Sequence, residues 1–169
     1  MQGKVQAIYL QDETPARRFT ALIRSVISSG RGHVATTHGD APSDYAPALG
    51  WRYRRFGLEG GAWDPQGRLV GWLDGINLYL DPETAYAEAQ SLANTEGQPL
   101  LVSAKELWKR LDEAGLLVSK DPDHQTTRMT ICEMRRRVLH LDARRVLGLG
   151  EDKGQDDEGQ DEVGSGALY

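Results

Sequence analysis

The sequence predicts an α+β fold, a winged helix-turn-helix preceded by a helix and a small antiparallel β-sheet. Three observations predict it: a capped amphipathic segment, a second helix signal before it and a strand–turn–strand pattern after it. In this order the three parts make up a winged helix. We therefore expect an N-terminal helix and sheet over residues 1–80, a winged-helix domain over 81–147 and a disordered acidic tail over 148–169.

The amphipathic segment runs from Pro99 to Leu117 and is the centre of the predicted fold. Ser103 and Glu106 stand three residues apart, the spacing of a capping box, in which each side chain binds the other residue's backbone amide. Gly115 is a left-handed stop for this helix. One side is apolar and carries Ala104, Leu107, Trp108, Leu111 and Ala114; the other carries Lys105, Lys109 and Asp112. The pattern predicts a recognition helix that buries Trp108 and exposes its lysines.

A second helix is predicted just before this segment. Asp81 is a candidate N-cap and Pro82 suits the first helical position, while Glu96-Gly97 ends the helix. Its apolar stripe consists of Tyr86, Ala89, Leu92 and Ala93, with Ala85 at the edge. We interpret it as the supporting helix of the helix-turn-helix.

The residues after the amphipathic segment have the pattern of a β-hairpin. Two β-rich runs, Thr126–Ile131 and Arg136–Leu141, are separated by residues 132–135. A hairpin in this place is the wing of a winged helix. The expected wing-tip glycine is absent, because Glu133-Met134 occupies its position.

The N-terminal part begins with a strong helix signal from Asp12 to Gly30. Thr14 is a candidate N-cap with Pro15 at the first helical position. The apolar stripe consists of Phe19, Leu22, Ile23, Val26 and Ile27. The following residues, His33 to Leu49, contain Gly, Asp, Pro and Ser at loop frequency and are expected to form an irregular connection.

Trp51 to Leu80 is expected to form about three short antiparallel strands, with turns at residues 57–61, 64–67 and 74–75. The aromatic residues of this stretch allow two interpretations. We favour a small core packed against the first helix. The alternative is a platform on which bases stack beside Arg52, Arg54, Arg55 and Arg68.

The composition is that of an ordinary globular protein, with 39% hydrophobic and 27% charged residues. No apolar run approaches the length of a membrane span, and the first residues lack the pattern of a secretory signal. The single cysteine, Cys132, cannot form an internal disulfide. These features predict a cytoplasmic protein without membrane contact.

The net charge of −5 is unevenly distributed along the chain. Residues 151–169 contain seven acidic residues against Lys153 alone, so the rest of the chain sums to +1. The acidic total therefore does not exclude a nucleic-acid partner.

Motifs of catalysis are missing. The sequence has no phosphate-binding loop, no nucleophile elbow and no zinc-protease motif. His33, His38 and Asp40 lack the spacing of metal ligands, and Cys132 is expected to be a small buried filler. We expect no enzyme activity, no metal and no small-molecule cofactor.

Five stretches resemble the C-terminal region of bacterial primase–helicase-type proteins of plasmids, phages and integrated elements: Gly71-Trp72, Tyr79–Pro82, Leu107–Leu111, Gly115–Leu117 and Arg136–His140. The resemblance covers roughly residues 12–142. It implies a place in the DNA replication of a mobile genetic element. Because no Walker lysine or primase carboxylate set is present, it carries over no catalytic residue.

The predicted function is that of a non-catalytic nucleic-acid-binding accessory module. Its expected contacts with double- or single-stranded DNA lie on the recognition helix and the wing: Lys105, Lys109 and Arg110 on the helix, and Arg128, Arg135, Arg136 and Arg137 on the wing.

A protein-interaction module is the alternative. The same domain would dock onto a replicative helicase or primase without contacting DNA. Asp112, Glu113 and Glu133 interrupt the basic surface, which favours this alternative.

Overall fold

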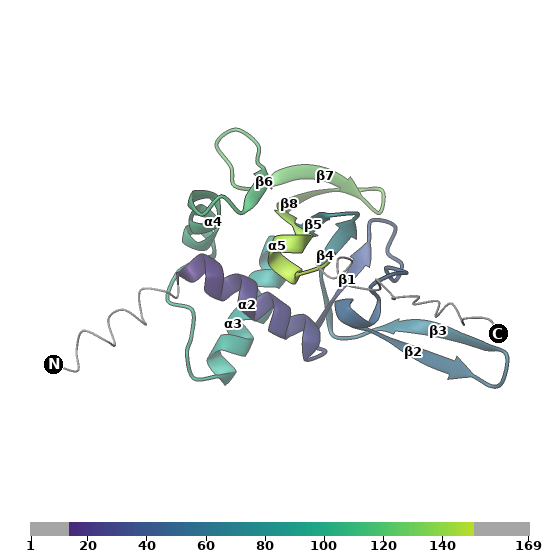
Figure 1. The fold of residues 1–169 in the computed structure, drawn as a ribbon. Coiled ribbons are helices and arrows are strands. Elements are labelled where there is room, and N and C mark those ends of the chain that lie inside the picture. Colours follow the sequence, from purple (N-terminus) through teal and green to yellow (C-terminus); the bar gives the residue numbers. More distant parts are fainter. Residues whose placement is uncertain (1–13, 151–169) are drawn as a thin grey trace, which may run out of the picture.

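The computed structural model describes residues 14–150 (Figure 1). Residues 151–169, the greater part of the predicted acidic tail, lie outside this range. The elements in chain order are α2 (Pro15–Ser28), β1 (Gly32–Thr36), the 3-10 helix η1 (Pro47–Leu49), β2 (Trp51–Phe56), β3 (Gly60–Pro65), β4 (Arg68–Asp74), β5 (Asn77–Leu80), α3 (Pro82–Thr95), α4 (Ala104–Glu113), β6 (Leu117–Ser119), β7 (Thr127–Ile131), β8 (Met134–Asp142) and α5 (Ala143–Leu147).

A six-stranded mixed sheet forms the centre of the molecule. Its order is β1-β4-β5-β8-β6, and β7 also pairs with β8. Strand β1 runs parallel to β4, whereas the remaining pairs are antiparallel. Strands β6 and β7 pair with successive segments of β8, since Ser119 is opposite His140 and Thr127 is opposite Val138. Residues 120–126 leave the sheet between them.

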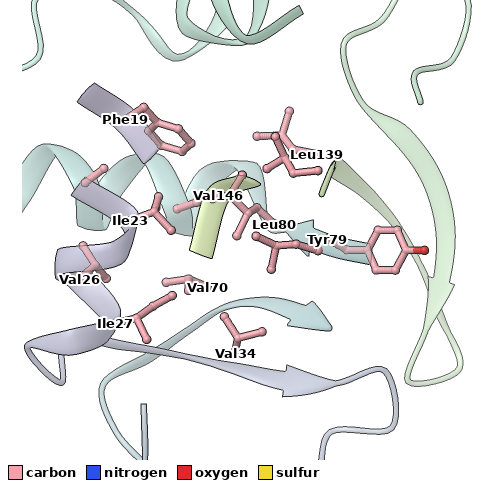
Figure 2. Packing of buried hydrophobic residues seen from close by; sticks show 14 of the residues in the cluster. Phe19, Ile23, Val26, Ile27, Val34, Val70, Tyr79, Leu80, Leu139 and Val146 are labelled. Carbon is pink, nitrogen blue, oxygen red and sulfur yellow. The ribbon is translucent and has the colours of Figure 1, made fainter. Parts of the chain in front are cut away.

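Helix α2 lies across the sheet and supplies much of the core. Its apolar stripe is buried as predicted, and Thr14 caps it by accepting a hydrogen bond from the Arg17 amide at 3.3 Å. Figure 2 shows Phe19 and Ile23 of this helix with Leu80 and Val146 in one apolar cluster. Burial of such side chains is the main stabilising contribution to the fold.

The other face of the sheet is covered by the β7–β8 hairpin. The Tyr79 ring points away from the α2 side chains, toward this hairpin (Figure 2). The hairpin tip reaches the opposite edge of the sheet, where the Cys132 amide donates to the Thr37 carbonyl at 3.1 Å. The sheet is therefore closed on one face by helices and on the other by its own hairpin.

The winged-helix prediction is wrong. The described part is α+β, with four α-helices, the mixed six-stranded sheet and a separate two-stranded one. The predicted hairpin forms, but β8 also pairs with β5 over Leu80↔Leu139 to Asn77↔Asp142. The hairpin is thus part of a sheet that continues through the N-terminal half, and not a wing attached to a small helical bundle.

The irregular connection predicted from His33 onward is wrong at its start. Gly32–Thr36 form β1, a short parallel strand whose first four residues are buried. A strand buried on both faces lacks the apolar–polar alternation of a half-exposed strand, so the pattern gave no strand signal.

Among the described strands, β2 and β3 pair only with each other, and Figure 1 shows them projecting from the body of the molecule. Between residues 14 and 150, no helix combines the length and apolarity needed to cross a membrane.

Candidate nucleic-acid interface

Four arginines of the β7–β8 hairpin line one surface cavity of about 260 Å³. They are Arg128 on β7 and Arg135, Arg136 and Arg137 on β8. The strand register places Arg128 opposite Arg137 and Thr130 opposite Arg135. We call this site the arginine cavity. None of the described residues that line it is acidic, and its two strands are fixed by backbone pairing.

Arg136 has a different environment from its neighbours. Its guanidinium carbon lies 5.1 Å from the ring centroid of Trp72, which is itself buried in the sheet. Its Nε is buried and has no hydrogen-bond partner in the part of the chain that the structure describes. Arg136 therefore also holds the hairpin onto the sheet through a cation–π contact.

Arg137 is partly neutralised by the loop between β6 and β7. Its Nη1 lies 3.6 Å from a carboxylate oxygen of Asp121 and 3.4 Å from the Thr126 hydroxyl. Arg128 and Arg135 are exposed, and neither forms an ion pair with a described carboxylate. These two side chains are the most available to an external anion.

The two turn residues explain how the β7–β8 hairpin forms without a glycine at its tip. Cys132 and Glu133 have φ angles of 50° and 63°, the left-handed pair that a two-residue hairpin turn requires. Cys132 is exposed, so its prediction as a buried filler is wrong. Its thiol lies 3.3 Å from the Thr37 carbonyl, which helps to hold the turn.

Helix α4 exposes the three remaining predicted residues, Lys105, Lys109 and Arg110. Arg110 is engaged by the helix itself, since its guanidinium lies 3.3 Å from Glu106 and 3.5 Å from Glu113. Figure 1 shows α4 and the hairpin tip on opposite sides of β6. The structure thus gathers the four arginines, and leaves the α4 residues apart from them.

The start of α4 follows the predicted capping box in part. The Ser103 hydroxyl accepts a hydrogen bond from the Glu106 amide at 3.2 Å. The Glu106 carboxylate pairs with Arg110, as described above.

A hydrogen-bonded chain beneath the hairpin was not predicted from the sequence. His140 on β8 contacts the Ser119 hydroxyl through Nδ1 at 2.7 Å and the Asn77 side-chain oxygen through Nε2 at 2.8 Å. The Tyr79 ring lies 4.8 Å from the imidazole. Burial lowers the pKa of His140 and raises the pKa of Tyr79. These hydrogen bonds link side chains of β5, β6 and β8. The pairing register of the three strands is what brings the side chains together.

A second basic cavity lies between α2 and α5. It measures about 380 Å³ and is lined by Arg17, Thr20, Ala21, Arg24, Leu116 and Arg145. Arg24 donates to the carbonyls of Val146 and Arg145, and Arg145 donates to the Gly115 carbonyl at 2.9 Å. These two arginines therefore tie the helices together.

Comparisons of this chain with protein-family models, with curated proteins and with solved structures found no match.

Proposed function

We propose that this chain is a non-catalytic nucleic-acid-binding module of a mobile-element DNA replication system, and that the arginine cavity receives backbone phosphates. The observation that carries the proposal is the convergence of four arginines from two paired strands on one cavity, which no acidic residue of the described range 14–150 lines. Guanidinium groups bind phosphate oxygens through paired N–H donors, so arginine is the residue best suited to this task.

The arginines divide into two roles in this proposal. Arg128 and Arg135 contact phosphate directly, because their side chains are exposed and form no ion pair with a described carboxylate; only the Arg128 backbone amide donates to Asp121. Arg136 and Arg137 are held from behind by Trp72 and Asp121 and fix the shape of the cavity. The sequence resemblance to primase–helicase-type proteins supports a replication context for this contact.

The test is a salt titration of binding to fluorescent single-stranded and duplex DNA, read by anisotropy. Each phosphate contact contributes about one unit to the slope of log affinity against log salt. The Arg128→Ala/Arg135→Ala variant should therefore bind more weakly, with a slope reduced by about two.

A matched control has the same change in net charge at arginines that do not line the cavity. Arg68→Ala/Arg144→Ala removes two exposed arginines that pair with Glu88 and Asp142. We expect this control to keep most of the binding. Equal losses in both variants would show that only net charge matters, and absence of DNA binding at low salt would favour docking onto a replicative helicase or primase.

A further inference from the structure

The ribbon formed by β2 and β3 (residues 51–65) stands apart from the sheet, and we call it the arm. Six residue pairs, from Trp51↔Pro65 to Phe56↔Gly60, give it a continuous ladder about 20 Å long. Figure 1 shows its far end well away from the helices and the main sheet. The base is anchored by Trp51, a buried side chain whose indole N–H donates to the Val34 carbonyl at 2.8 Å.

Side-chain contacts make the arm stiffer than a bare two-stranded ribbon, which is marginally stable in water. The Tyr53 ring lies over Gly61, where a Cβ atom would approach it to 2.4 Å, and it contacts Trp63 edge-on at 5.3 Å. On the other face, Arg54 lies 4.7 Å from the Phe56 ring centroid and 2.8 Å from Asp64. The arm is therefore held in shape without a partner.

Positive charge lies on both faces of the arm. Alternation along β2 places Arg55 on the face of Tyr53 and Arg52 on the face of Arg54. Arg54 is compensated by Asp64, whereas neither Arg52 nor Arg55 forms an ion pair with a described carboxylate. A flat protein surface would meet only one of these faces, but a nucleic-acid groove has phosphates on both sides.

The tip of the arm presents an exposed apolar side chain. Leu58 is fully exposed, at 104% of its reference area, and follows Gly57, whose φ of 63° turns the chain. Glu59, the only acid at the tip, is followed by two glycines. The major groove of duplex DNA admits a two-stranded ribbon, and an apolar side chain there can contact thymine methyl groups.

From these features we infer that the arm enters the major groove of duplex DNA, with Arg52 and Arg55 on phosphates and Leu58 against base edges. The inference rests on the proposed function and extends it: the chain prefers duplex to single-stranded DNA. The arginine cavity then contacts backbone phosphates, and the arm supplies the preference for a duplex.

The test compares the full chain with an Arg52→Ala/Arg55→Ala variant and a Leu58→Ser variant, using the same single-stranded and duplex probes. Both altered sites are exposed, so unchanged circular dichroism and thermal midpoints will show that folding is intact. We expect the arginine variant to lose about two units of salt slope on duplex, and much less on single strands. Arg68→Ala/Arg144→Ala again serves as the matched charge control.

Dimethyl sulfate probing of the duplex gives a second readout. Guanine N7 lies in the major groove and adenine N3 in the minor groove. The unaltered chain should protect N7, and the Leu58→Ser variant should lose that protection. Protection of N3 alone would overturn the inference.

The outcomes separate the two proposals. If the arm variants bind duplex like the unaltered chain while Arg128→Ala/Arg135→Ala binds weakly, the arm inference fails and the arginine cavity stands. The reverse result keeps the arm and removes the cavity. No DNA binding by the unaltered chain overturns both.

Discussion

His140 shows how the position of one residue sets a dependence on pH. Burial lowers the pKa of His140 below the ordinary histidine value of about 6.5, so the unfolded chain binds a proton more readily than the folded one. Stability is then unaffected by this group above that value and falls as the pH drops below it. Protonation would also remove the Nδ1 acceptor that faces the Ser119 hydroxyl.

We therefore expect the urea midpoint of unfolding to decrease between about pH 7 and pH 5. In His140→Gln, which cannot take up a proton, this decrease should be smaller. His38→Gln, at an exposed position, should keep the full pH dependence. Identical pH profiles for His140→Gln and the unaltered chain would contradict the expectation.

Arg136 and Arg135 are neighbours whose truncation should affect stability to different extents. Truncation in Arg136→Ala removes the contact with Trp72 and the packing of the side-chain stem, and should lower the unfolding free energy by about 1 kcal/mol. Arg135 is exposed, so Arg135→Ala should change it by less than about 0.5 kcal/mol. Chemical denaturation of both variants measures the difference, and equal stabilities would exclude a structural role for Arg136.

The sequence predicted which arginines lie on the hairpin, but not what each one contacts. Consecutive strand residues point to opposite faces, so Arg135 and Arg136 had to differ. Which of them would face the sheet depends on the register with β7 and on Trp72, a residue of β4. The register and the position of Trp72 both depend on tertiary structure, so the local sequence around Arg135 and Arg136 does not reveal them.

At the scale of elements, the hairpin turn between β7 and β8 is strained because non-glycine residues adopt left-handed backbone angles there. Glu133 adopts a left-handed φ of 63°, which costs a residue with a Cβ about 1 to 2 kcal/mol. Glu133→Gly should therefore raise the unfolding free energy by about 0.5 to 1 kcal/mol, even after glycine's entropic cost. Arg135→Gly, a control in the adjacent strand, should lower it by about the same amount. A destabilised Glu133→Gly chain would mean that the Glu133 side chain has a stabilising contact that outweighs the strain.

The three long helices were predictable because their ends carry local chemistry. Thr14, Asp81 and Ser103 mark their starts, and each lies at the N-cap in the structure. Strand β1 was missed, because its first four residues are buried through contacts with α2 and η1 and through pairing with β4, all of which are tertiary. Local sequence patterns thus located most elements. They could not show which strands pair, because paired strands such as β5 and β8 lie far apart in the sequence.

At the scale of the whole molecule, β8 is the element that joins the two halves. It pairs with β5 from the N-terminal half and with β6 and β7 from the C-terminal half. A helix, a second helix and a hairpin in succession occur both in a winged helix and in the mixed sheet seen here. The order of elements alone therefore could not exclude the winged helix. The separation of the arm from the main sheet is likewise set by tertiary pairing.

This pairing leads to a prediction about cooperativity. The domain boundary expected after residue 80 stays a prediction. Strands β5 and β8 are hydrogen-bonded across it. The ring centroids of Phe19 in α2 and Trp108 in α4 also lie 5.4 Å apart across it. We expect one unfolding transition for both halves. Leu80→Ala, at a fully buried position in β5, should lower the unfolding free energy by about 2 to 5 kcal/mol.

Two probes observed during urea unfolding test this expectation. Tryptophan fluorescence reports mainly on residues before 80, where three of the four tryptophans lie, and far-UV circular dichroism reports largely on α3 and α4 as well as α2. In the Leu80→Ala chain both midpoints should shift together, because unfolding of β5 removes a partner of β8. Leu101→Ala, at an exposed position, should shift neither. Two separate transitions, with only the fluorescence midpoint lowered, would show instead that the halves fold independently and that the boundary after residue 80 is real.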